Sequence, residues 1–276
     1  MKVTDKDYYL DESLKEMVDL MCLKLKKRNL DNLLIIDGNE GFGKTNISAA
    51  IGYYSAYVLG RSFSHENFFF DLDDMVKFAS NNKEQVIIWD EAALGGLASE
   101  WGTNVQRKLL KLLMIVRKKK HFFIFNIPRF FKLNEYIIID RAVGLVHVYS
   151  TDGINLGRFT YYKGNALEKL FNDWKKKRKR SYRMFYSLRG RFTAMLGKVI
   201  DEEAYDKRKD EAISNINKIK SRRETNAEEL SIKLKYKVAT LKGVKRKDVA
   251  KHFGVGRNTL LSWERLAEKH KNLLED

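Results

Sequence analysis

The sequence predicts an α/β core followed by a basic helical extension and a C-terminal helix-turn-helix. Three features indicate this: short apolar runs alternate with helical segments, one glycine-rich turn joins such a run to a helix, and the last part of the chain has its own turn pattern. Alternating strands and helices predict a mostly parallel sheet with helices on both faces. We expect domains over residues 1–165, 166–225 and 226–276.

The expected elements follow in order along the first domain. Residues 11–28 space apolar side chains at helical intervals, which predicts an amphipathic helix. Short apolar runs predict buried strands. The predicted strands are 33–37, 68–70, 86–89, 121–127, 144–150 and 157–162, and the predicted helices between them are 44–59, 72–80 and 104–120.

The whole chain has a net charge of +17, and this positive charge is concentrated in its second half. Residues 1–150 hold 21 Lys and Arg against 19 Asp and Glu, whereas residues 151–276 hold 32 against 17. A near-neutral core joined to a strongly basic extension indicates a polyanion partner, and nucleic acid is the commonest one. An anionic membrane surface would attract similar charge, but the basic half shows no amphipathic helix with a bulky apolar face.

Other features exclude several function classes. Cys22 has no partner for a disulfide and no zinc-ligand spacing, so we interpret it as a small buried residue. The sequence shows no signal peptide and no apolar run long enough to span a bilayer. We therefore expect a cytoplasmic protein, located in the host cytoplasm if the chain is viral.

Residues 38–45 complete the pattern G-x-x-x-x-G-K-[ST] between a predicted strand and a predicted helix. Glycines let backbone N–H groups surround phosphate oxygens, and the helix N-terminus adds a positive dipole end. Lys44 is expected to reach the β- and γ-phosphates, and Thr45 to help hold Mg²⁺. The residues expected to bind ATP are Gly38, Asn39, Glu40, Gly41, Phe42, Gly43, Lys44 and Thr45.

An acidic pair follows the predicted strand 86–89. Asp90 stands 45 residues after Thr45, with one predicted strand between them, and is the expected Mg²⁺ carboxylate. Glu91 is the candidate for orienting or deprotonating the attacking water. The inserted strand and the adjacent Glu indicate a RecA-like ATPase that does mechanical work. Asn126 is the candidate γ-phosphate sensor; its alternative role is to satisfy a backbone group at the strand end.

From about residue 33 to 150, the order of features resembles the HerA/FtsK-like DNA-pumping ATPases, which include the Zot-like ATPases of phages and mobile elements. The segment DEAALGGLASEW, the helix NVQRKLLKLLMIVRKKK and the stretch FFIFNIPRFFKLNEYIIIDRAVGLVHV carry the resemblance. Asn126 stands where FtsK-type proteins usually carry Gln. The resemblance implies a hexameric or pentameric homo-oligomeric ring, in which a neighbouring subunit supplies an arginine to the γ-phosphate. Arg141 is the first candidate for this arginine and Arg117 the second.

The densest basic segment covers residues 174–183, where seven of ten residues are cationic and Phe185 and Tyr186 follow. Cations neutralise phosphates, and aromatic rings can stack on bases. The alternative is a solvated, charged helix face. The candidate DNA contacts of this segment are Lys175, Lys176, Lys177, Arg178 and Arg180.

The string DVAKHFGVGRNTLLSWERL, within residues 226–276, is similar to the helix-turn-helix DNA-binding tails of resolvases and many phage proteins. Ala250 lets two helices cross closely, and Gly254 permits a left-handed turn. The second helix would enter the major groove. The candidate DNA contacts are Lys247, Arg257, Asn258, Thr259, Ser262 and Arg265. The alternative is a three-helix cap that contacts protein.

Three functions are compatible with these features. The leading hypothesis is an ATP-driven translocase or packaging-type motor that acts on duplex DNA for a virus, plasmid or conjugative element. The second is an ATP-switched DNA-binding protein in replication, partition or transcription. The third is a phage assembly ATPase that acts on a protein substrate. A motor requires DNA-stimulated turnover, a switch requires only slow hydrolysis and site-specific binding, and an assembly factor would show no DNA stimulation.

Overall fold

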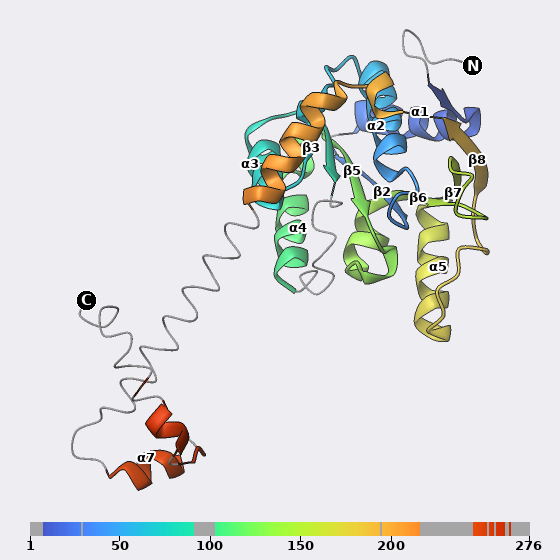
Figure 1. Ribbon diagram of the computed structural model, residues 1–276. Helices are drawn as coiled ribbons and strands as arrows, with labels where there is room; N and C mark the ends of the chain where they lie inside the picture. The colour runs from blue at the N-terminus through green and yellow to red at the C-terminus, as the bar shows by residue number, and fades with distance from the viewer. Residues whose placement is uncertain are drawn as a thin grey trace. The chain divides into compact units, whose positions relative to one another are not determined.

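The computed structural model describes residues 8–28, 30–90, 103–193, 195–215, 245–252, 254–256, 258–262 and 265. The chain divides into two compact units, Met1–Ala212 and Ile213–Asp276. The first unit is an α/β structure built around one sheet (Figure 1).

The sheet of the first unit has eight strands among the described residues, in the order β1-β8-β7-β6-β2-β5-β4-β3. The strands are β1 (Tyr9–Leu10), β2 (Asn32–Gly38), β3 (Phe68–Phe69), β4 (Val86–Asp90), β5 (Phe122–Ile127), β6 (Ala142–Tyr149), β7 (Arg158–Lys163) and β8 (Leu188–Thr193).

The sheet is mixed, so the expectation of a mostly parallel sheet is only partly correct. The strands from β6 through β2, β5 and β4 to β3 pair in parallel. The pairs β6–β7, β7–β8 and β8–β1 are antiparallel. The reason is the short turn between β6 and β7, because a short turn can join antiparallel strands but not parallel ones.

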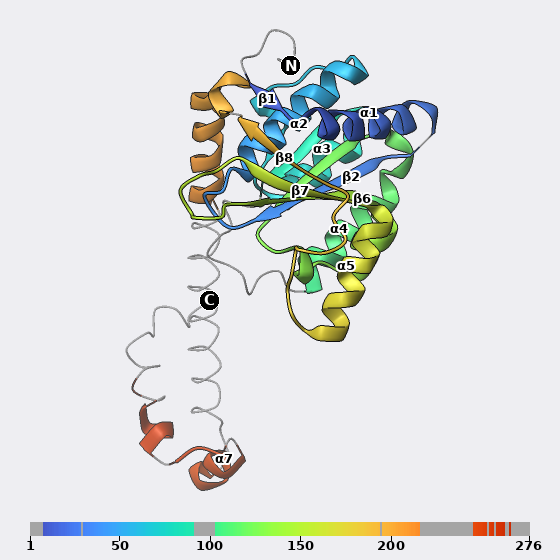
Figure 2. The same cartoon turned by 90° about the vertical axis from the view of Figure 1, so that its right-hand side faces the viewer.

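Helices cover both faces of this sheet, as the sequence predicts. On one face lie α1 (Glu12–Lys27), α2 (Lys44–Leu59) and a helix over residues 202–215. On the other lie α3 (Leu72–Asn81), α4 (Thr103–Ile115) and α5 (Gly164–Lys177). Figure 2 shows α1 and α2 on the opposite side of the sheet from α4 and α5. Shorter helical turns cover His65–Asn67, Arg117–Lys119, Phe130–Lys132, Ile137–Arg141 and Leu196–Lys198.

The central strand β2 is buried along its whole length. Leu34 and Ile36 face the core under α1 and α2, whereas Leu33 and Ile35 face the core under α3 to α5. A strand buried on both faces reads as a continuous apolar run, which explains why the sequence identifies it directly.

The prediction of a separate helical extension over residues 166–225 is wrong for most of its length. Strand β8 pairs with β7 inside the sheet, and α5 packs on the sheet through Leu167 and Leu170. The first compact unit accordingly ends at Ala212 and not at residue 165. The sequence does not identify β8 because LRGRFT places only one buried residue, Phe192, among arginines and a glycine.

The described part of the second unit contains α7 (Arg246–His252) and a helical segment over residues 258–262. Between them, Gly254 has a φ of 61°, in the left-handed region expected for it. The N–H of Val255 donates to the carbonyl oxygen of Ala250 at 2.9 Å, which closes the end of α7. Val249 and Leu260 are buried together, so the two helical segments share a small apolar contact.

Candidate active site

The loop between β2 and α2 has a backbone that depends on glycine. Gly38, Gly41 and Gly43 have φ angles of 147°, 76° and 91°, a region that glycine tolerates best. A Cβ atom on Gly38 would lie 2.3 Å from the carbonyl oxygen of Val148, so space as well as conformation requires glycine there. Conformation alone requires it at Gly41, where a Cβ atom would meet nothing within 4 Å.

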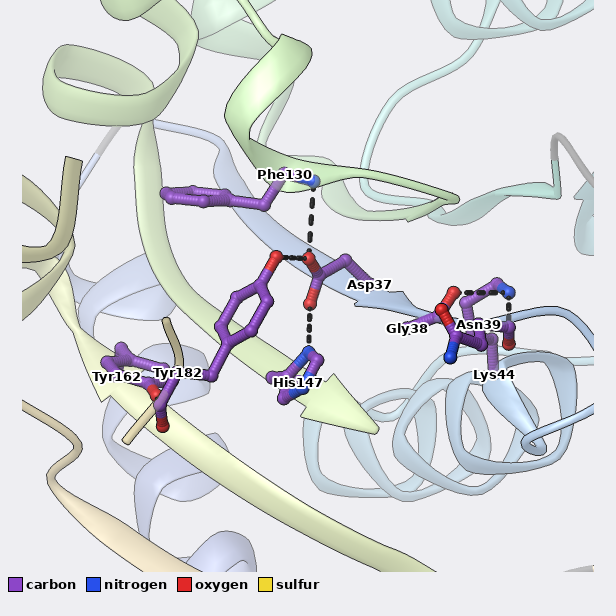
Figure 3. A network of polar contacts seen from close by, with 8 residues as sticks. All are labelled: Asp37, Gly38, Asn39, Lys44, Phe130, His147, Tyr162 and Tyr182. Atoms are coloured by element: carbon purple, nitrogen blue, oxygen red, sulfur yellow. Dashed lines mark hydrogen bonds and ion pairs between the residues drawn. The ribbon is translucent and has the colours of Figure 1, made fainter. Parts of the chain in front are cut away.

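The side chain of Lys44 is folded into this loop and is buried. Its Nζ atom donates to the carbonyl oxygens of Gly38 at 2.8 Å and Asn39 at 2.9 Å (Figure 3). The side chains of Asn39 and Glu40 are exposed, so these residues line the loop through their backbone. Phe42 packs against the core under α1 and α2, and this contact anchors the loop.

Thr45 and Asp90, which are 45 residues apart in sequence, meet at the carboxyl edge of the sheet. The Thr45 hydroxyl donates to Oδ2 of Asp90 at 2.8 Å. Asp90 is fully buried, and the Tyr205 hydroxyl donates to the same oxygen at 2.8 Å. Burial, and secondarily the Asp90 carboxylate, raise the pKa of Tyr205 well above its ordinary value, so this hydroxyl remains a donor.

The oxygen atoms of Thr45 and Asp90 suit Mg²⁺, which proteins usually hold by one or two carboxylates together with substrate phosphates. The donor set is hard and contains no nitrogen or sulfur ligand, and it lies at the first turn of α2, next to the glycine loop. The residues present therefore fit a magnesium–nucleotide complex.

Asn126 lies beside Asp90 on the neighbouring strand, in direct register with it. Its Nδ2 donates to the Ser48 hydroxyl at 2.9 Å. Its Oδ1 is buried and has no hydrogen-bond partner among the described residues. None of these described hydrogen bonds goes to a backbone group, which the alternative role at the strand end would require.

Asp37 is a site residue that the sequence analysis missed. It directly precedes Gly38, is almost fully buried, and accepts hydrogen bonds from three directions (Figure 3). The Phe130 N–H donates to Oδ2 at 3.2 Å, His147 Nδ1 contacts Oδ1 at 2.9 Å, and the Tyr182 hydroxyl donates to Oδ2. Its sequence signal is a single charged residue in an otherwise apolar strand, because a buried charge requires partners.

The partners of Asp37 hold separate segments together at the base of the glycine loop. His147 is on β6, in register with Asp37, and the ring of Tyr182 stacks on it with centroids 3.5 Å apart. Tyr162 on β7 donates its hydroxyl to the carbonyl oxygen of Tyr182 at 2.5 Å. The basic segment that contains Tyr182 is thus fixed to the strand that carries the loop.

Replacing Asp37 by asparagine is expected to lower the free energy of unfolding by about 2 kcal/mol. Asparagine keeps the size and shape of the side chain, but it removes the charge and one of the two acceptor oxygens that the three donors share. The measurement is urea unfolding followed by circular dichroism. Asp152→Asn is the matched control, since Asp152 also accepts several hydrogen bonds but lies in an exposed turn. Equal and small losses in both variants would contradict this assignment.

The two candidate trans arginines lie in different environments. The side chain of Arg141 is only 9% exposed, and its Nη2 contacts the Asp31 carboxylate at 2.6 Å and the Leu113 carbonyl oxygen at 2.9 Å. Both charged residues precede strands, so this pair lies at the amino edge of the sheet, away from Gly38. A residue that reaches a neighbouring subunit must be exposed, so the structure argues against Arg141. Arg117 is exposed and remains the candidate.

The side chains of the basic segment, residues 174–183, differ in their ion pairing and in their exposure to solvent. Lys175 and Lys177 are paired with Glu135 at 2.5 Å and Asp173 at 2.6 Å, and Lys176, Arg178 and Arg180 are exposed. Trp174 and Tyr182 are partly buried and pack against Phe131 and the core around it.

Further along the same segment, Phe185 and Tyr186 are exposed, and the Arg189 guanidinium lies 3.9 Å from the centroid of the Tyr186 ring. Exposed rings beside cations can stack on nucleic-acid bases while the cations contact phosphates. Phe185 and Tyr186, and not Trp174 and Tyr182, are therefore available for such contacts.

In the second unit, the exposed DNA-contact candidates are Lys247, Asn258, Thr259, Ser262 and Arg265. The Ser262 hydroxyl donates to the carbonyl oxygen of Thr259 at 2.7 Å, so its oxygen would meet DNA as an acceptor, for example of a base amino group. Arg257, and Glu91 in the first unit, lie outside the described residues.

The chain matches no protein-family model, and no curated protein is significantly similar to it. No helix in the described part of the chain is both long and apolar enough to cross a membrane.

Proposed function

We propose that this protein is a Mg²⁺-dependent ATPase that acts on duplex DNA, as a ring-forming translocase or packaging motor of a virus, plasmid or conjugative element. The observation that carries the ATPase part is the 2.8 Å contact between Thr45 and Asp90, beside a loop in which Gly38, Gly41 and Gly43 have positive φ angles. ATP binding needs the loop, and hydrolysis needs the carboxylate beside it.

Each residue of the site has a role in this reaction. The N–H groups of the loop and the Lys44 ammonium would bind the β- and γ-phosphates. Mg²⁺, held by Thr45 and Asp90, would neutralise the charge that develops on the phosphate oxygens. Glu91, which follows Asp90 in the sequence, would accept a proton from the attacking water, and Asn126 would sense the γ-phosphate.

The strand order supports a RecA-like core within the mixed sheet. β5 lies between the loop strand β2 and the Asp90 strand β4. This inserted strand brings Asn126 to the position beside Asp90, where a residue can respond to the γ-phosphate. The antiparallel strands β7, β8 and β1 extend the sheet at the other side of β2.

The DNA part of the proposal rests on charge and on the second unit. The exposed cations around Arg178 and Arg180 can neutralise phosphates, and the turn at Gly254 supports a helix-turn-helix. In a ring, Arg117 would serve as the arginine that a neighbouring subunit supplies. The burial of Arg141 favours a second candidate, an ATP-switched DNA-binding protein, because such a switch needs no arginine in trans.

The test is the rate of ATP hydrolysis with and without duplex DNA. We expect DNA to stimulate the rate severalfold and salt to weaken this effect, because phosphate contacts release counterions. The variant Arg178→Glu with Arg180→Glu should lose most of the stimulation. The matched charge reversal, Lys24→Glu with Lys27→Glu on α1, should retain it, since both lysines lie on the other side of the sheet.

Each other result has a defined meaning. A rate that duplex DNA leaves unchanged would end the motor proposal and favour an assembly ATPase. Slow hydrolysis combined with binding to one DNA sequence would favour the switch. Absence of ATP hydrolysis under all conditions would overturn the ATPase assignment itself.

A further inference from the structure

We propose that Tyr205 is a positioning residue for the Mg²⁺-binding carboxylate of Asp90. This inference rests on the proposed ATPase function and adds a residue that lies 115 positions beyond Asp90 in the sequence. Tyr205 belongs to the helix over residues 202–215, outside the loop and strand motifs of the site.

Tyr205 acts on one defined oxygen of the carboxylate. Its hydroxyl and that of Thr45 both donate to Oδ2 of Asp90, each at 2.8 Å. Two donors that approach one oxygen from different elements, α2 and the helix over residues 202–215, fix the plane in which the carboxylate lies.

Packing determines where the Tyr205 hydroxyl lies. Its ring is buried and meets the rings of Phe68 and Phe70 edge to face, with centroids 5.1 Å and 5.3 Å apart. One helical turn later, Arg208 donates to the carbonyl oxygen of His65 at 2.6 Å. These contacts hold the helix on the segment around β3, so the hydroxyl meets Asp90 in one orientation.

Such a contact matters because Mg²⁺ requires nearly ideal octahedral geometry. A carboxylate that rotates freely would spend part of its time in orientations that cannot serve the ion. Loss of a hydrogen bond that orients a metal ligand typically lowers metal affinity or activity 10- to 100-fold. Tyr205 therefore contributes to the Mg²⁺-dependent part of nucleotide binding and not to the phosphate contacts of the loop.

The experiment measures binding of a fluorescent, non-hydrolysable ATP analogue to the full chain, in EDTA and in Mg²⁺. For Tyr205→Phe, which keeps the ring, we expect unchanged affinity for the analogue in EDTA. The factor by which Mg²⁺ increases this affinity should be about tenfold smaller than in the wild type. The midpoint of the Mg²⁺ titration should rise by a similar factor. Tyr54→Phe is the control, because Tyr54 also donates to a carboxylate, that of Asp19, away from the site.

The results separate this inference from the proposed function. If the wild-type chain does not bind the analogue, the ATPase proposal fails. If it binds with a clear Mg²⁺ gain and Tyr205→Phe shows the same gain, the role of Tyr205 is refuted. Should Tyr205→Phe be unfolded by circular dichroism, Arg208→Gln loosens the same helix without touching Asp90, and an undiminished Mg²⁺ gain in that variant would also refute it.

Discussion

Arg141→Ala is expected to lower the free energy of unfolding by about 3–5 kcal/mol, because it leaves the Asp31 carboxylate buried without its cation. The side chains of Arg141 and Asp31 are only 9% and 3% exposed, so water cannot replace the lost partner. The variant also removes the donor to the Leu113 carbonyl oxygen, which links α4 to the start of β6. The measurement is urea unfolding at pH 7.

Arg117→Ala is the matched control, since Arg117 is an exposed cation near the same end of the sheet. Its stability should stay within about 0.5 kcal/mol of wild type. If Arg117 is the trans arginine, this variant instead loses ATP hydrolysis while remaining folded. A folded and stable Arg141→Ala protein that loses ATP hydrolysis would contradict our placement and restore Arg141 as a catalytic candidate.

The instability of Arg141→Ala should also depend on pH. Burial raises the pKa of Asp31, and Arg141 is the main group that opposes this rise. Without Arg141 the pKa of the folded state rises further, so the folded protein binds a proton that the unfolded chain has lost. Stability therefore falls as pH increases through the folded pKa. The variant should be closer to wild type in acid than at pH 7.

The sequence identified the parts of the fold that follow from local pattern. Leu33 to Ile36 and Val86 to Trp89 are apolar runs, and the glycine loop lies between such a run and a helix. Strand β8 could not be recognised in this way, because its alternating arginines pair with β7 through the backbone and bury only Phe192. Backbone pairing alone does not require an alternating apolar pattern of side chains when a strand is mostly exposed.

The site shows the same division between local and distant information. Motif spacing predicted Lys44, Thr45 and Asp90, because they lie at the ends of adjacent elements of one α/β pattern. Tyr205 and the partners of Asp37 come from segments far away in the sequence, and no local pattern relates them to the loop. Arg141 shows the opposite difference, since the resemblance suggested that it acts on a neighbouring subunit, whereas it forms an ion pair with the buried side chain of Asp31.

Lys44→Ala is expected to reduce ATP hydrolysis by at least about 100-fold, with loss of nucleotide binding, since Lys44 is the only cation of residues 38–45 and the expected partner of the β- and γ-phosphates. Glu91→Gln should reduce hydrolysis by about 100-fold or more but bind nucleotide normally, because a general base acts only in the chemical step. The measurements are analogue binding and steady-state ATP hydrolysis on both variants. Normal hydrolysis by Glu91→Gln would show that another group activates the water.

The loop contacts of Lys44 make a structural control necessary. Its Nζ donates to two carbonyl oxygens of the loop, so Lys44→Ala removes hydrogen bonds as well as the phosphate contact. Lys26→Ala is the matched variant, because Lys26 also donates to a carbonyl oxygen, that of Val58 at 2.7 Å, but lies on α1. If Lys44→Ala and Lys26→Ala unfold at similar urea concentrations and only the former loses nucleotide, the defect lies in phosphate binding. Nucleotide binding that survives in a folded Lys44→Ala protein would remove the main support for an ATP site in this loop.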